Sequence, residues 1–180
     1  MHSSGSDANG RVIRNSKYPS LMAKRVICPV YEPTPMDLGD SLYFRAKHTL
    51  KLLEAAEVYM KKGYTILSLE AKTNCNGEAD MIVEKEGLWK VVELKTKWRI
   101  ESWDIFQAVL YAEPGMAVDI VDGANNIGQL DSDRVEEIQK LLIHRLSTQT
   151  EDPVPSKLCR YCSNYDCKFN DQNKLTGVGC

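Results

Sequence analysis

The feature of the sequence that most constrains its fold is a pair of strand-like runs between residues 77 and 95, joined by Glu86-Gly87. A two-residue connection with glycine in its second position is typical of an antiparallel hairpin. If Glu86 and Gly87 form that turn, Lys85 lies opposite Leu88, and the register of every other pair follows. The apolar dipeptide at 91–92 indicates that the second strand lies inside a sheet and not at its edge.

This register collects charged residues at one end of the hairpin. Asp80 falls opposite Glu93, and Glu78 falls opposite Lys95. Because side chains alternate in direction along a strand, all four project from one face. The other face is apolar and predicts a contact with the core through Ala79, Met81, Val83, Val92 and Leu94.

Two directly opposed carboxylates repel each other, so Asp80 and Glu93 need a compensating cation. Oxygen ligands of this kind bind Mg²⁺ or Mn²⁺, and Lys95 on the same face can stabilise charge that develops on a phosphate. For Glu78 we favour an ion pair with Lys95 over a role in binding a second metal. The alternative interpretation of the whole face is a solvated surface with ordinary ion pairs.

Hydrophobic periodicity predicts further elements around the hairpin. A helix from about Ser41 to Lys62, capped by Asp40 or Ser41 and ended by Gly63, is apolar on two sides, and we expect it to be buried on both. The two sides contain Leu42, Ala46, Leu50, Leu53 and Met60, and Leu52, Ala55 and Tyr59, with His48 near the second.

The remaining predicted elements are strands at 64–72, 77–84, 88–96 and 117–121 and helices at 102–112 and 133–147. Asp133 and Glu136 can form a capping box at the start of the last helix. The order α-β-β-β-α-β-α predicts an α/β protein with a mixed sheet flanked by helices.

Composition places the chain among globular proteins. It has 180 residues, 43% of them hydrophobic and 27% charged, which fits one domain and excludes disorder of the whole chain. No apolar run is long enough to cross a bilayer, so we expect no membrane association. With 23 basic and 25 acidic residues, a uniformly basic nucleic-acid binder is excluded. The polar start lacks a signal peptide, and residues 1–16 resemble a mobile expression-tag remnant, so we expect a cytoplasmic protein.

Basic and aromatic residues alternate in two places. The stretch 8–31 lacks acidic residues and includes Tyr18 and Tyr31, and a second group follows the hairpin. Such groups can hold a nucleic-acid backbone and stack its bases, although a solvated arm is the alternative for the first. The candidate nucleic-acid-binding residues are Arg11, Arg14, Lys17, Lys24, Arg25, Lys97, Trp98 and Arg99.

Three of the six cysteines lie close together as Cys159-x₂-Cys162-x₄-Cys167. In a chain without a signal peptide such a group indicates a metal site more often than disulfides. A four-thiolate site needs one more ligand, from Cys28, Cys75 or Cys180. Ligand spacing fits zinc and an iron–sulfur cluster equally well.

Asp80 followed by Glu93-Leu94-Lys95 resembles the D…E-x-K signature of the PD-(D/E)XK nuclease superfamily. Gln107 and Tyr111 resemble the Q-x-x-x-Y motif of its RecB-like branch, and His48 lies on the helix before the sheet, as the metal-ligand histidine of that branch does. Cys28 upstream and three cysteines downstream are similar to the iron–sulfur RecB-like nucleases. The small size and the segment from Tyr18 to Leu21 favour the CRISPR-associated Cas four type. The likeness covers about Tyr18 to Lys168.

The resemblance implies a restriction-endonuclease-like core at 17–150 and a cluster-binding segment at 151–180 that packs back on the N-terminal segment. It implies metal binding by His48, Asp80, Glu93 and the main-chain carbonyl of Leu94. It assigns Lys95 to the transition state, with Gln107 and Tyr111 positioning Lys95 or the nucleotide. It selects Cys28 with Cys159, Cys162 and Cys167 as ligands of a 4Fe–4S cluster.

The function that the resemblance implies is exonuclease action on single-stranded DNA from the 5′ end, with Mn²⁺ or Mg²⁺. In a CRISPR setting such an enzyme acts with the integrase complex, and a homo-oligomer is compatible with it. A viral or stand-alone enzyme fits the sequence equally well. The alternatives are a structure-specific endonuclease of the same superfamily and a non-catalytic zinc or iron–sulfur subunit that binds nucleic acid.

Overall fold

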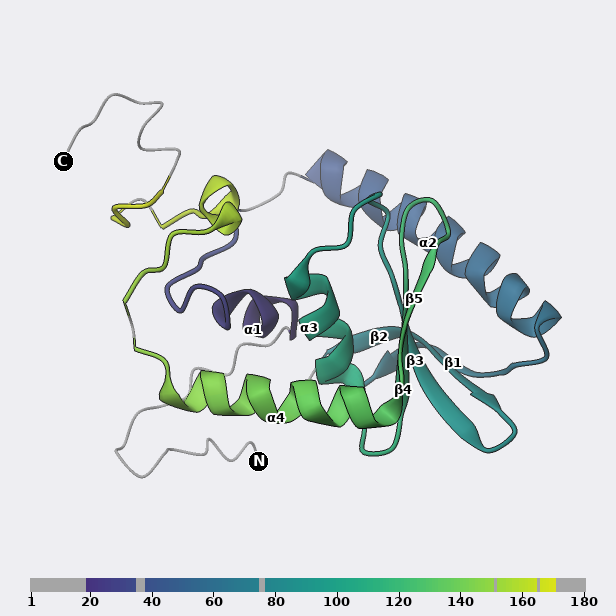
Figure 1. The fold of residues 1–180 in the computed structure, drawn as a ribbon. Helices are drawn as coiled ribbons and strands as arrows, with labels where there is room; N and C mark the ends of the chain where they lie inside the picture. Colours follow the sequence, from purple (N-terminus) through teal and green to yellow (C-terminus); the bar gives the residue numbers. More distant parts are fainter. Residues whose placement is uncertain (1–18, 35–37, 75–76, 151, 165, 171–180) are drawn as a thin grey trace, which may run out of the picture.

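The computed structural model describes residues 19–34, 38–74, 77–150, 152–164 and 166–170 (Figure 1). Several of the predictions above lie outside the described residues. They concern the tag-like stretch at 1–16 and the side chains of Arg11, Arg14, Lys17, Cys75 and Cys180.

A mixed sheet is at the centre of the fold, with five strands in the order β1-β2-β3-β4-β5. Neighbours are antiparallel except for β3 and β4, which are parallel and joined by a helix. The strands are β1 (Thr65–Lys72), β2 (Glu78–Lys85), β3 (Leu88–Leu94), β4 (Ala117–Val121) and β5 (Ile127–Leu130). The predicted α/β class and the central position of the second hairpin strand are confirmed, whereas β5 was not predicted.

The hairpin register is the predicted one. Lys85 pairs with Leu88, and the pairing runs in step as far as Met81 and Val92. Glu86 and Gly87 have positive φ angles of 55° and 80°, as a tight hairpin turn requires at both central positions. Met81, Val83, Val92 and Leu94 share the face that packs on the helix Leu38–Lys61, as predicted, whereas Ala79, beyond the paired residues, lies in the cluster on the side of the helix Ser102–Tyr111, so its predicted face is wrong.

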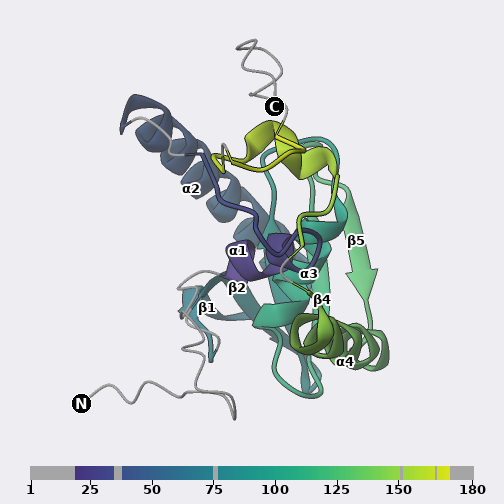
Figure 2. The same cartoon turned by 90° about the vertical axis from the view of Figure 1, so that its left-hand side faces the viewer.

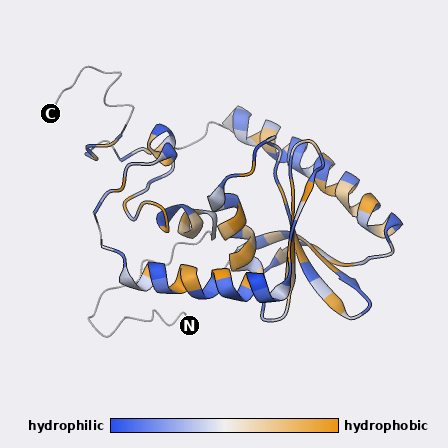
Figure 3. Cartoon of the chain, viewed as in Figure 1, coloured by the Kyte–Doolittle hydropathy of each residue, from blue (hydrophilic) through white to orange (hydrophobic). Residues whose placement is uncertain are grey.

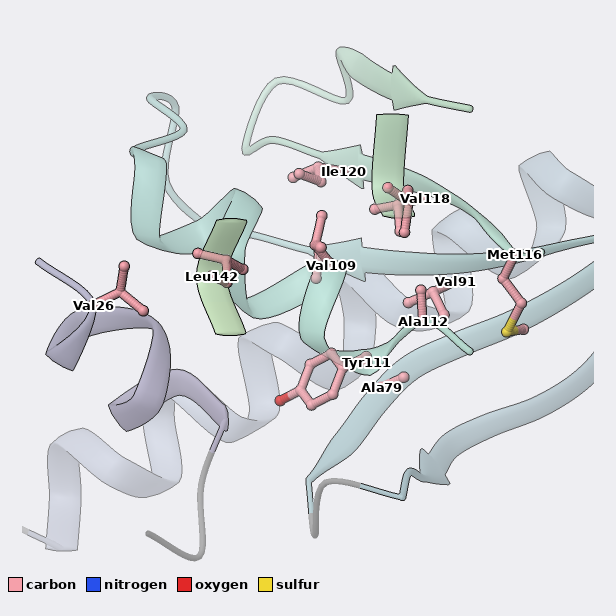
Figure 4. Packing of buried hydrophobic residues seen from close by; sticks show 12 residues of the cluster. Val26, Ala79, Val91, Val109, Tyr111, Ala112, Met116, Val118, Ile120 and Leu142 are labelled. Carbon is pink, nitrogen blue, oxygen red and sulfur yellow. The ribbon is translucent and has the colours of Figure 1, made fainter. Parts of the chain in front are cut away.

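Helices cover both faces of the sheet. On one face lie α3 (Ser102–Tyr111) and α4 (Ser132–Thr148), and α1 (Pro19–Arg25) packs against α3. Figure 4 shows Val91 and Val118 of the sheet facing Val109 of α3, with Leu142 of α4 nearby. On the other face, α2 (Leu38–Lys61) packs against strands β2, β3 and β4 through its C-terminal half.

The expectation that the long helix is buried on two sides is wrong. Only one side of α2 is buried, at Leu52, Ala55, Ala56 and Tyr59. The other stripe is exposed, because a single sheet covers only one side of a helix, and no described element lies over the rest. Figure 3 shows hydrophobic and hydrophilic residues alternating along α2, whereas α3 is mostly hydrophobic. The exposed apolar residues of α2 include Leu42, Leu50, Leu53 and Met60.

Two of the predicted helix caps are also wrong. The helix α4 begins one residue earlier than expected, and Asp131 caps it by accepting a hydrogen bond from the Arg134 N–H at 2.8 Å, in place of Asp133 and Glu136. Because α2 begins at Leu38, Asp40 lies within its first turn. Gly63 follows the end of α2 with a φ of 82°, as predicted.

Two short helices were not predicted. Pro19 occupies the first position of α1, where its fixed φ is favourable and its missing N–H costs nothing. The 3₁₀ helix η1 (Lys157–Tyr161) lies in the cysteine-rich segment. None of the helices in the described part of the chain has the length and apolarity that crossing a membrane would require.

A buried polar network joins α2 to the sheet. The Tyr59 hydroxyl donates to Asp119 Oδ2 at 2.7 Å, and Lys90 Nζ lies 3.1 Å from Asp119 Oδ1. Burial and the Asp119 carboxylate raise the pKa of Tyr59, which keeps this phenol a donor. Asp119 is only 1% exposed, so these two partners and a longer hydrogen bond from Gln129 Nε2 at 3.5 Å replace the water that its carboxylate loses.

Replacing Asp119 by alanine should therefore destabilise the fold. Loss of one member of a buried ion pair leaves the other uncompensated and typically costs about 3–5 kcal/mol. Urea unfolding followed by circular dichroism measures this cost. Glu137→Ala, which breaks an exposed pair with Arg134 on α4, is the control and should cost less than about 1 kcal/mol. Equal stability of Asp119→Ala and the unmodified protein would contradict the assigned network.

Candidate active site

The carboxylates of the hairpin lie where β2, β3 and α2 meet. Asp80 on β2 accepts a hydrogen bond from the Leu94 N–H at 2.6 Å through Oδ2. Its other oxygen lies 3.1 Å from Nε2 of His48, which α2 supplies. The hydrogen bond to Asp80 raises the pKa of His48, although partial burial opposes this. The structure thus brings together His48 and Asp80, two of the predicted metal ligands, and the contact of Asp80 with Leu94 is through the N–H and not through the predicted carbonyl.

Glu93 is a carboxylate buried on the central strand, with 2% exposure. Burial raises its pKa to about 7, against the lowering effect of Lys95. One carboxylate oxygen, Oε1, lies 2.7 Å from Lys95 Nζ. The other, Oε2, is buried and has no hydrogen-bond partner among the described residues. An oxygen in that position is free to bind a cation.

Lys95 is held in place from three sides. Besides Glu93, its Nζ donates to Gln107 Oε1 at 3.0 Å and lies 3.8 Å from Asp104 Oδ1. Burial acts to lower the pKa of Lys95, but the surrounding carboxylates outweigh it and the pKa is raised. The Gln107 amide in turn donates to the Tyr111 hydroxyl at 3.0 Å. The i, i+4 pair on α3 therefore contacts Lys95 through Gln107.

The structure places Glu78 away from Lys95, its predicted partner. It is an exposed residue that pairs with Lys72 in the β1–β2 ladder, and the ion pairs of Lys95 within the described residues are with Glu93 and Asp104. The predicted Glu78–Lys95 ion pair is wrong, because the described β2–β3 pairing ends at Met81 and Val92 and Lys95 turns toward α3.

Asp104 is a site residue that the sequence interpretation missed. It is buried at the start of α3, where its Oδ2 accepts from the Glu101 N–H at 2.8 Å and contacts Lys97 Nζ at 2.5 Å. Its Oδ1 faces Lys95. The signal in the sequence was the Glu101-x-x-Asp104 capping pattern before an apolar helix.

The donor set suits a hard divalent cation, with the imidazole of His48 and the carboxylates of Asp80 and Glu93, the latter with its Oε2 unpartnered among the described residues. In the described part of the chain, however, no group of three or more histidine, cysteine, aspartate or glutamate side chains is gathered closely enough to hold a metal ion, and this includes the cysteines described below. His48 contacts Asp80, and Lys95 occupies one oxygen of Glu93. The residues fit the predicted metal by chemistry, and binding it requires Asp80 to exchange its contact with His48.

Four cysteines lie around a small pocket between the two ends of the described chain. Cys28 and three cysteines from the C-terminal segment line it, and all four are free thiols. Figure 2 shows the C-terminal segment, with η1 in yellow-green, next to the N-terminal segment. Their contacts include an antiparallel bridge between Pro33 and Cys162 and a hydrogen bond from the Tyr31 hydroxyl to the Tyr161 carbonyl at 3.2 Å. The three C-terminal cysteines are Cys159, Cys162 and Cys167.

The predicted nucleic-acid-binding residues divide into two groups. Lys24 lines a large cavity together with Lys97, Trp98 and Arg99, which follow β3. Arg25 is not among the residues that line this cavity, and its Nε donates to the Tyr31 carbonyl at 3.5 Å.

Comparisons with known proteins found no relative from which the role of this site could be inferred. The chain matches no known family, and neither a curated protein nor a solved structure is detectably similar to it.

Proposed function

We propose that this protein is a metal-dependent deoxyribonuclease that hydrolyses phosphodiester bonds. The observation that supports this best is the buried Glu93–Lys95 pair on the central strand, beside the Asp80 carboxylate and His48. Burying Glu93 and Lys95 beside the partly buried Asp80 costs folding free energy, and strongly perturbed groups of this kind are typical of active sites.

In this proposal Asp80, Glu93, His48 and the Leu94 carbonyl hold Mg²⁺ or Mn²⁺. When bound, such an ion supplies an activated water and stabilises negative charge on the phosphate oxygens. The protein's own groups do the positioning. Lys95 supplies a positive charge, and its contacts with Gln107 and Glu93 hold the ammonium group in one position. The side chain therefore needs little reorganisation as negative charge develops on the phosphate.

We further propose that the substrate is single-stranded DNA, degraded from the 5′ end by a cytoplasmic enzyme. These finer assignments, the association with a CRISPR integrase complex and any homo-oligomer rest on the motif resemblance. The basic and aromatic residues at 97–99 beside the site support a flexible strand as substrate, because single strands bind by phosphate contacts and base stacking. The leading alternative is endonuclease action by the same residues.

Substitutions in the charged corner, the group formed by His48, Asp80, Glu93 and Lys95, should abolish cleavage. Glu93→Gln and Lys95→Ala should each lower the rate of Mn²⁺-dependent cleavage of end-labelled single-stranded DNA by at least about 100-fold, because each removes a charge that acts in the transition state. Glu78→Gln is the matched control, since Glu78 lies on β2, the other strand of the same hairpin, but is exposed and pairs with β1. It should leave the rate within about twofold.

Full activity of both variants, with melting temperatures like that of the unmodified protein, would refute the proposed site. A covalently closed single-stranded circle separates the two modes of cleavage. Resistance of the circle supports an exonuclease, whereas its rapid linearisation favours the endonuclease alternative.

We also propose a 4Fe–4S cluster bound by Cys28, Cys159, Cys162 and Cys167. Their location around one pocket supports it, since four thiolates are the usual ligands of such a cluster. Its role is structural, because it joins two segments that are more than a hundred residues apart in the chain.

Anaerobically purified protein should therefore contain about four irons and four acid-labile sulfides per chain. It should also show broad visible absorption, and Cys162→Ser should lose both the iron and the colour. One zinc per chain in a colourless protein would contradict the cluster and favour a zinc site.

A further inference from the structure

A cavity of about 720 Å³ lies beside the charged corner and is not explained by the chemistry of hydrolysis. Three parts of the chain form it: α1, the connection between β3 and α3, and η1 of the C-terminal segment. Its volume is within the usual range for small-molecule sites, about 300–1,000 Å³. The cavity therefore has room for a nucleotide.

The charges in this cavity do not balance. Five basic side chains line it against one carboxylate, that of Glu101. Glu101 already has Arg99 at 3.6 Å and Lys157 at 3.7 Å, and Lys97 is paired with Asp104. This leaves two cations, Lys24 and Arg160, without a carboxylate at ion-pair distance among the described residues.

Lys24 is held in an unfavourable setting for a cation. The Tyr31 ring, whose centre lies 5.4 Å from the ammonium, offers a favourable cation–π contact, but burial and neighbouring charges oppose the positive charge. Partial burial lowers the pKa of Lys24, and the nearby positive charges of Lys95 and Lys97 lower it further, although Asp104 opposes them. An anion bound in the cavity would relieve this repulsion.

Aromatic side chains supply stacking surfaces around the same space. Trp98 is 79% exposed and Tyr161 is 58% exposed, and both line the cavity, so both rings are accessible to a ligand there. Trp103 lies deeper, with the Lys97 ammonium 5.2 Å from its ring centre. A base stacked on an exposed ring contributes substantially to single-strand binding.

Asp104 connects the cavity to the charged corner. One of its oxygens contacts Lys97, which lines the cavity, and the other faces Lys95. A phosphate held near Lys24 is therefore close to the group that would act on the next phosphodiester.

We infer that this cavity binds a nucleotide with a terminal phosphate, Lys24 and Arg160 holding the phosphate and Trp98 or Tyr161 stacking on the base. A phosphomonoester has a charge of about −1.5 to −2 at neutral pH, which matches two unpaired cations, whereas an internal phosphodiester has a single charge. The inference rests on the proposed function and gives it a substrate class: a strand with a phosphorylated end. The same chemistry would also accept a free nucleoside monophosphate.

Binding without cleavage tests this inference. Fluorescence anisotropy in EDTA compares labelled oligothymidylates with a 5′-phosphate, a 3′-phosphate or no terminal phosphate. We expect a phosphate at one end to tighten binding about tenfold. Lys24→Gln and Arg160→Gln should each remove most of that preference. Arg160 is exposed, so its replacement leaves the core intact. Lys140→Gln on exposed α4 surface is the charge-matched control and should keep the preference.

Equal affinity for all three oligonucleotides, or an equal loss of preference in Lys140→Gln, would overturn the inference. Competition with free thymidine 5′-monophosphate identifies the natural source of the phosphate. Weak competition supports a strand end, and competition as strong as that of the phosphorylated strand supports a free nucleotide. Binding in EDTA does not depend on hydrolysis, so the two proposals can fail separately. A phosphate preference in a protein that never cleaves DNA would support nucleotide binding in the cavity and refute the proposed nuclease activity.

Discussion

The geometry of the candidate site depends on the burial of Glu93 beside Lys95 on the central strand. Neighbouring strands and α3 bury Glu93 and most of Lys95, whose side chain is 14% exposed, so the charge on each depends largely on the other. That dependence fixes the lysine at 2.7 Å from one oxygen and leaves the second oxygen unpartnered. The surrounding polar contacts, from Gln107, Tyr111 and Asp104, orient the lysine and do not neutralise the second oxygen.

Two separate regions meet at α3. Its start provides Asp104, which contacts Lys95 on one side and Lys97 of the basic cavity on the other, and its later turns provide Gln107 and Tyr111. The cysteine pocket is adjacent, since Tyr31 and Leu158 line both it and the basic cavity. Loss of order in the C-terminal segment would thus alter the cavity before it altered the charged corner.

The sequence predicted those parts of the fold that local rules determine. The Glu86-Gly87 turn fixes the hairpin register, and i, i+4 spacing puts Gln107 and Tyr111 on one side of a helix. The exposure of Leu50 on α2 could not be read locally, because it depends on which neighbour covers the helix. Glu78 was misplaced for a similar reason: periodicity gives its side of the strand, but where the pairing with β3 ends is a tertiary property.

The most direct test of the account is whether the charged corner binds a divalent ion. Titration of Mn²⁺, followed by the electron paramagnetic resonance signal of the free ion, measures this without a substrate. The account predicts a bound Mn²⁺ that is lost in Asp80→Asn and in Glu93→Gln but retained in Glu78→Gln. Absence of Mn²⁺ binding in the unmodified protein, or binding that survives both substitutions, would contradict it.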